Sequence, residues 1–153
     1  MQISLDPAVA ADLKIAVEDT LITRLETISS GERLTLARRA SGQVAAALLA
    51  DADPRIVAAA LSNPFMTEGL LLQALAKDDV SDAFVSLVCH DPKWSARRDV
   101  RIILLRNPKT PLARLLAFAQ SLPAATVRHA LQNSPLPHAT LAYLHAELER
   151  RSR

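Results

Sequence analysis

The feature that most constrains the fold is a short pattern that occurs three times: a leucine, any residue, an asparagine and then a turn that contains proline. The asparagines are Asn63, Asn107 and Asn133, and a leucine follows each of them by eight residues, at Leu71, Leu115 and Leu141. A leucine can end one helix in the core, asparagine tolerates the left-handed conformation that caps a helix end, and proline forbids continuation of the helix. The pattern therefore predicts a repeated corner between consecutive helices, and the alternative is a ladder of asparagines that binds a ligand.

The composition favours an all-α protein. Hydrophobic residues make up 50% of the chain, with an excess of Ala and Leu, whereas aromatic residues make up 3% and there are three glycines. Ala and Leu are good helix formers, and a β-rich fold needs more aromatic residues and more glycine-bearing turns. The length of 153 residues fits a single domain.

Capping signals and apolar periodicity place about ten short helices. Asp-Pro pairs at Asp6, Asp53 and Asp91 predict helix starts, as does Thr110 before Pro111, because Asp and Thr can cap the first turn and proline suits the next position. Ser29 and Glu32 spell a capping box, and Pro123 and Pro137 open two further helices. The predicted helices cover residues 7–28, 31–39, 42–50, 54–62, 67–77, 80–90, 92–106, 111–120, 124–132 and 137–150.

Two segments resemble a known repeat family. The segments are V-x-x-A-L-x-N-P at 57–64, followed by T-E-x-L-L, and L-L-R-N-P-K-T-P-L at 104–112. They resemble the bacterial leucine-rich repeat variant family, a HEAT-like solenoid. The resemblance implies a HEAT-like superhelix, an α-solenoid of about ten short helices in antiparallel pairs. The type member of the family carries an iron–sulfur cluster on clustered cysteines; this chain has one cysteine, Cys89, so no cofactor is expected. The predicted organisation is one domain over 1–153, with a capping helix in 1–30, repeats in 31–135, and a capping helix and polar tail in 136–153.

Charge is distributed unevenly along the chain. Residues 1–90 hold seven Lys/Arg and twelve Asp/Glu, whereas residues 91–153 hold eleven and four. Such a division favours different partners for different surfaces, and it also suits head-to-tail self-association.

The best candidate site in the sequence is the segment DPKWSARRDVR at 91–101. If a helix begins at Pro92, Trp94 and the arginines at 97, 98 and 101 fall within an arc of about 100°. The indole and guanidinium groups would then bind phosphates and stack on a base or an aromatic side chain. The predicted binding residues are Trp94, Arg97, Arg98, Arg101, Arg106, Lys109, Arg114 and Arg128. The alternative is that Trp94 fills the core while the arginines are solvated or pair with nearby acids.

No catalytic or metal site is predicted. Cys89, His90 and Asp91 have the residue types of a nucleophile triad, but consecutive side chains diverge on a helix. His138 and His145 are too far apart along a helix to share a metal ion. The start of the chain lacks the pattern of a secretory signal, and no apolar run is long enough to span a membrane, so a cytoplasmic location is expected.

The predicted function is a non-enzymatic scaffold or adaptor that binds a protein partner. The main alternative is a nucleic-acid-binding protein that uses the basic C-terminal half with Trp94 stacking. A HEAT-like DNA glycosylase is the enzymatic alternative; the scarcity of aromatic residues to hold a flipped base argues against it.

Overall fold

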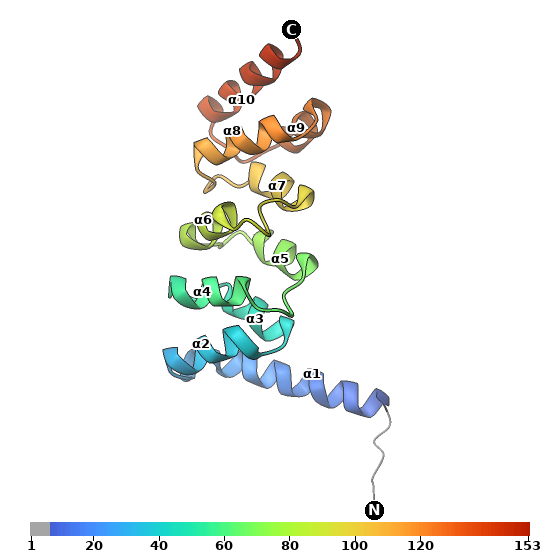
Figure 1. Ribbon diagram of the computed structural model, residues 1–153, viewed down its shortest axis with the longest axis vertical. Coiled ribbons are helices and arrows are strands. Elements are labelled where there is room, and N and C mark those ends of the chain that lie inside the picture. Colours follow the sequence, from blue (N-terminus) through green and yellow to red (C-terminus); the bar gives the residue numbers. More distant parts are fainter. Residues whose placement is uncertain (1–6) are drawn as a thin grey trace, which may run out of the picture. The chain divides into compact units, whose positions relative to one another are not determined.

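The computed structural model describes residues 7–153, and all regular structure within this range is helical (Figure 1). This confirms the prediction of an all-α protein. A short 3-10 turn, η1 at Leu25–Thr27, follows the first helix. The α-helices are α1 Pro7–Arg24, α2 Ser30–Arg39, α3 Gly42–Leu48, α4 Pro54–Leu61, α5 Glu68–Leu75, α6 Asp82–His90, α7 Arg98–Leu105, α8 Leu112–Ser121, α9 Ala124–Leu131 and α10 His138–Arg151. Within the described range, none of these helices combines the length and the hydropathy that crossing a membrane requires.

The described residues form two compact units that divide between Leu70 and Leu71, inside α5. In the N-terminal unit α2, α3 and α4 pack on one another, and their apolar side chains, such as Val44 and Ile56, are fully buried. α1 contributes no buried residue, and it leaves Leu13 about half exposed. The core of this unit therefore lies between the three short helices.

In the C-terminal unit α7 lies against α8 and α9, and α10 packs on α8 and α9. Val100, Leu104, Phe118 and Leu144 are buried in this unit. The hydrophobic positions recur at helical spacing on the covered faces, as expected for short helices that packing stabilises.

Several predicted helix starts are confirmed. The Asp53 carboxylate accepts a hydrogen bond from the Arg55 N–H at 2.9 Å, with Pro54 at the first helical position of α4. Ser29 accepts from the Glu32 N–H at 3.2 Å at the start of α2. Asp6 lies outside the described residues.

The predicted helix start at Asp91 is wrong. α7 begins at Arg98 rather than Pro92, and Asp91 instead caps the end of α6. Its Oδ1 accepts from the N–H groups of Lys93 and Trp94 at 2.9 and 3.1 Å, which holds the following residues in a turn. Thr110 is also not a cap, because its buried hydroxyl donates to the Leu104 carbonyl at 2.7 Å.

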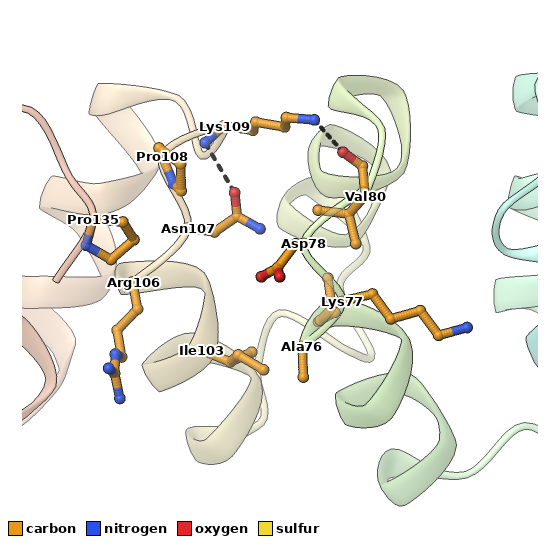
Figure 2. A pocket seen from close by; sticks show the side chains of 11 residues that line it. Ala76, Lys77, Asp78, Val80, Ile103, Arg106, Asn107, Pro108, Lys109 and Pro135 are labelled. Carbon is orange, nitrogen blue, oxygen red and sulfur yellow. Dashed lines mark hydrogen bonds between the residues drawn. The ribbon is translucent and has the colours of Figure 1, made fainter.

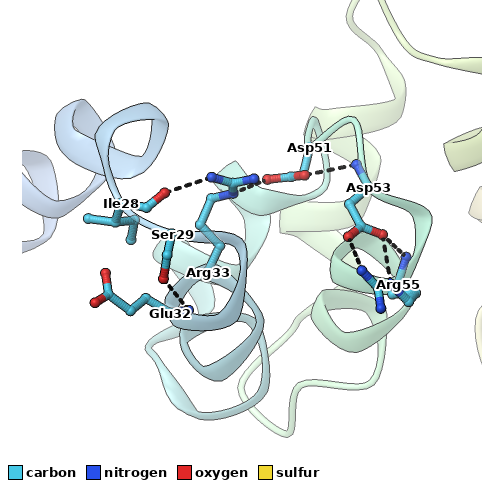
Figure 3. Close-up of polar contacts among 7 residues, drawn as sticks. All are labelled: Ile28, Ser29, Glu32, Arg33, Asp51, Asp53 and Arg55. Atoms are coloured by element: carbon cyan, nitrogen blue, oxygen red, sulfur yellow. Dashed lines mark hydrogen bonds and ion pairs between the residues drawn. The ribbon is translucent and has the colours of Figure 1, made fainter.

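An ion pair ties three segments of the N-terminal unit together (Figure 3). Arg33 on α2 donates to Asp51 after α3 at 2.8 Å and to the Ile28 carbonyl at 2.8 Å. Asp51 also accepts from the Asp53 N–H at 2.9 Å, at the start of α4. Because both charged side chains are mostly covered, removing either one would leave the other charge poorly solvated.

Candidate functional site

Two of the predicted corners share the same backbone geometry. We call residues 60–67 the Asn63 corner and residues 104–111 the Asn107 corner. In each, the asparagine N–H donates to the carbonyl three residues back, at 3.2 Å for Asn63 and 3.1 Å for Asn107. Each Oδ1 accepts from the N–H two residues on, that of Phe65 at 2.7 Å and that of Lys109 at 2.9 Å. The side chain of asparagine therefore builds the turn at both corners.

The predicted left-handed conformation is wrong at these two corners. Among residues 7–153, Asn133 is the one non-glycine residue with positive φ, at 54°. The turn after α9 is formed by its neighbour Ser134, whose hydroxyl accepts from the Leu136 N–H at 3.3 Å. The predicted left-handed conformation is therefore confirmed at Asn133, the third copy of the pattern, where serine in place of asparagine accepts the hydrogen bond of the turn.

The Asn63 corner is closed. Asn63 is completely buried, and its Nδ2 donates to the carbonyls of Ala37 at 2.9 Å and Ala40 at 3.0 Å, at the end of α2. Gly42 lies directly against this corner, since a Cβ built on it would come within 2.4 Å of the Phe65 carbonyl oxygen. Close approach and full hydrogen bonding leave no room for a ligand here.

The Asn107 corner is open. Residues 76–81 separate α5 from α6, whereas only residues 40–41 separate α2 from α3. The longer connection holds the chain away from Asn107, whose amide is half-buried and whose nitrogen points into a cavity toward Asp78 (Figure 2). At the Asn63 corner the asparagine amide donates to the connection, whereas here the Lys109 ammonium does so, by donating to the Val80 carbonyl.

We call this space the Asn107 cavity; it has a volume of about 570 Å³ and lies entirely within the C-terminal unit. Apolar side chains, which include Val80 and Ile103, make up part of its lining. Three cations, Lys77, Arg106 and Lys109, and one carboxylate, Asp78, line it. The lining therefore carries an excess of positive charge.

A second hollow adjoins the Asn107 cavity. It has a volume of about 440 Å³ and shares Ala76, Ile103 and Arg106 with the cavity. Leu72 and Ile102 add apolar surface to it, and Asp99 adds a carboxylate. The two hollows lie side by side along α5 and α7, and we call them together the groove.

The sequence-predicted stripe around Trp94 does not form. Trp94 is only 2% exposed, with Lys93 Nζ at 4.5 Å and Arg97 Cζ at 5.7 Å from its ring centroid. A buried indole cannot stack on a base, so the predicted role of Trp94 is wrong. The reason is the late start of α7, which leaves Trp94 in the turn that Asp91 caps and removes it from the helical arc with Arg98 and Arg101.

The other predicted cations divide between structural and exposed positions. Arg101 Nε donates to the Ser95 carbonyl at 2.6 Å, and Arg114 donates to the Cys89 carbonyl. Both guanidiniums also lie over the Phe118 ring, at 6.0 and 5.2 Å. Arg101 and Arg114 are therefore committed to holding the C-terminal unit together.

Arg97, Arg98, Arg106 and Arg128 are exposed. Arg128 contacts Ser152 near the end of α10, at 3.1 Å. Of the eight predicted binding residues, only Arg106 and Lys109 line the Asn107 cavity.

Cys89 is a core residue in the structure. Its side chain is buried, and burial raises the pKa of the thiol to about 11, although Arg114 and Thr110 oppose the rise. A protonated, covered thiol is a poor nucleophile. Within residues 7–153 there is also no cluster of three His, Cys, Asp or Glu side chains that could hold a metal ion.

From the sequence, Asn107 is expected only as a corner residue or as part of a ligand-binding ladder, and Asp78 is not singled out. The predicted connections are of equal length, at 40–41 and 78–79, and the longer connection at 76–81 is found only in the structure. Three acidic residues close together, at 78, 79 and 82, are by themselves typical of a solvated helix start. Comparisons of this chain with protein-family models, with curated protein sequences and with solved structures gave no match.

Proposed function

We propose that the chain is a cytoplasmic, non-enzymatic helical-repeat scaffold, a solenoid that binds a protein partner through the groove at the Asn107 cavity. The observation that carries the proposal is the contrast between a closed and an open corner of the same design. The closed corner stabilises the fold, and the open one presents polar groups and apolar surface in an accessible groove. Solenoid repeats commonly use such extended surfaces to hold partners.

Local equivalences support a repeat of three helices. Ser41 and Ser81 cap α3 and α6, and their hydroxyls accept from the N–H three residues on, at 3.5 and 3.1 Å. Asp51 and Asp91 then follow the same helices, and each accepts from the N–H two residues on at 2.9 Å. The asparagine corners follow the next helix, α4 or α7. On this basis α3–α4–α5 and α6–α7–α8 are successive copies, rather than the two-helix units of the resembling family.

The experiment is affinity capture from extracts of the source cells with three forms of the protein, each with and without nuclease. Arg106→Glu reverses a charge in the groove, and Arg128→Glu makes the same change at an exposed site away from it. Circular dichroism verifies that both variants fold.

We expect one protein to co-purify in stoichiometric amount with the wild type and with Arg128→Glu, but not with Arg106→Glu. Equal capture by all three forms would refute the groove as the binding surface. Material that nuclease releases would place nucleic acid ahead of a protein partner. Recovery of no stoichiometric protein would overturn the adaptor function itself.

A further inference from the structure

We infer that the Asn107 cavity binds an extended, acidic polypeptide segment; the inference rests on the proposed function and names the chemistry of the partner. The first argument is the hydrogen bonding of the closed corner. There, Asn63 Nδ2 donates to two main-chain carbonyls of the connection that covers it. Asn107 has the same backbone geometry, but its Nδ2 faces open space, where a partner's main-chain carbonyl takes the place of the missing ones.

The second argument is charge. Lys77 and Arg106 form no ion pair among the described residues, and both line the cavity. The Lys109 ammonium is already engaged, by the Val80 carbonyl and, at 3.8 Å, by the Asp82 carboxylate. In the Asn107 cavity two uncommitted cations stand against one carboxylate, Asp78, which favours an occupant that brings negative charge there. The adjoining hollow adds the Asp99 carboxylate, so this preference is confined to the Asn107 cavity.

The third argument is shape. Both hollows are open to solvent and share three lining residues, so an extended chain can lie across both. An extended chain presents a carbonyl and an N–H at every residue, about 3.3 Å apart. Asn107 Nδ2 can donate to such a carbonyl, and the Asp78 carboxylate can accept from an N–H. Leu72 and Ile102 provide an apolar surface for one side chain of the segment.

The test uses fluorescein-labelled nonapeptides titrated into the full-length protein and followed by fluorescence anisotropy. One peptide carries three glutamates interspersed with leucine and alanine, and a matched peptide carries lysines in place of the glutamates. The protein forms are wild type, Asn107→Ala, the double variant Lys77→Glu/Arg106→Glu, and Arg128→Glu as the control. Polyphosphate serves as a competitor that has the charge but no peptide backbone.

We expect the acidic peptide to bind the wild type and Arg128→Glu with the same affinity. Its affinity should fall about fivefold for Asn107→Ala and at least tenfold for the double variant. The double variant should prefer the lysine peptide, because its rim has the reversed charge. The inference is overturned if the wild type binds the acidic and the lysine peptide equally, or if the double variant binds the acidic peptide as tightly as the wild type does. It is also overturned if polyphosphate binds as tightly as the acidic peptide and loses affinity equally when Lys77 and Arg106 are replaced. If a captured partner depends on Arg106 but acidic peptides do not bind, the adaptor function stands and only the acidic segment fails.

Discussion

Replacing the two asparagines by alanine should have very different effects on stability. Asn63 makes three side-chain hydrogen bonds in a fully buried position, to the Ala37 and Ala40 carbonyls and from the Phe65 N–H. Asn63→Ala leaves all three groups without this partner; the Ala37 carbonyl is buried, and the Ala40 carbonyl and the Phe65 N–H are partly covered. Each buried group left unsatisfied costs about 1–3 kcal/mol, so we expect the free energy of unfolding to fall by about 3–5 kcal/mol after partial relaxation.

Asn107→Ala removes one hydrogen bond, from the Lys109 N–H, and water can reach the vacated space through the cavity. We expect a loss of about 1 kcal/mol, since solvent compensates the exposed N–H. The comparison is matched, because both substitutions remove the same atoms from the same type of turn.

The assay is urea unfolding followed by far-ultraviolet circular dichroism, which reports helices of both units. Each variant is compared with the wild type for the midpoint and the slope of its transition. Equal losses at the two sites, or a larger loss for Asn107→Ala, would refute the distinction between a closed and an open corner.

Three further predictions follow from the packing. Gly42→Ala should lower the free energy of unfolding by about 1–3 kcal/mol in the same assay, because the added Cβ meets the Phe65 carbonyl. Gly31→Ala should be neutral or slightly stabilising, because nothing lies within 4 Å of the added Cβ. A larger loss of stability for Gly31→Ala than for Gly42→Ala would contradict this. Trp94→Ala should cost about 3–5 kcal/mol, and iodide should quench the wild-type tryptophan fluorescence poorly; efficient quenching would show that the indole is exposed. Because burial raises the pKa of the Cys89 thiol from 9.0 to about 11, the unfolded chain loses this proton first on raising the pH, so the free energy of unfolding should fall by up to about 2–3 kcal/mol between pH 9 and 11. Cys89→Ala should lack this part of the fall, and an identical pH dependence of the two proteins would refute the assignment.

Much of the fold followed from local signals. The ten predicted helix positions match the observed α-helices in order and approximate extent, because most of them begin at a proline or at a Ser or Asp cap. The large error, at 92–97, arose because an Asp-Pro pair can either begin a helix or form a turn. At Asp53 the carboxylate caps a helix that follows directly, whereas at Asp91 the same carboxylate closes a turn after α6. The choice depends on what the next side chain packs against, and Trp94 is buried in that turn.

The candidate site was harder to anticipate for the same reason. Asn63 and Asn107 are equivalent in sequence, and the difference between them comes from a separate segment, the connection that covers one and stands away from the other. Local pattern cannot show which carbonyls will lie opposite an amide. Likewise, Arg101, Arg106 and Arg114 carry the same charge, but tertiary contacts engage the first and third and leave the second at the cavity.

The most direct test of this account is to follow the side-chain amide protons of Asn63 and Asn107 by nuclear magnetic resonance. Both pairs are assigned by comparison with the alanine variants, and their exchange with water is measured before and after adding the acidic nonapeptide. We predict slow exchange at Asn63 that the peptide does not alter, and fast exchange at Asn107 that slows, with a shifted resonance, once the peptide binds. Protection of both amides in the free protein, or a peptide that leaves Asn107 unchanged, would contradict the central claim.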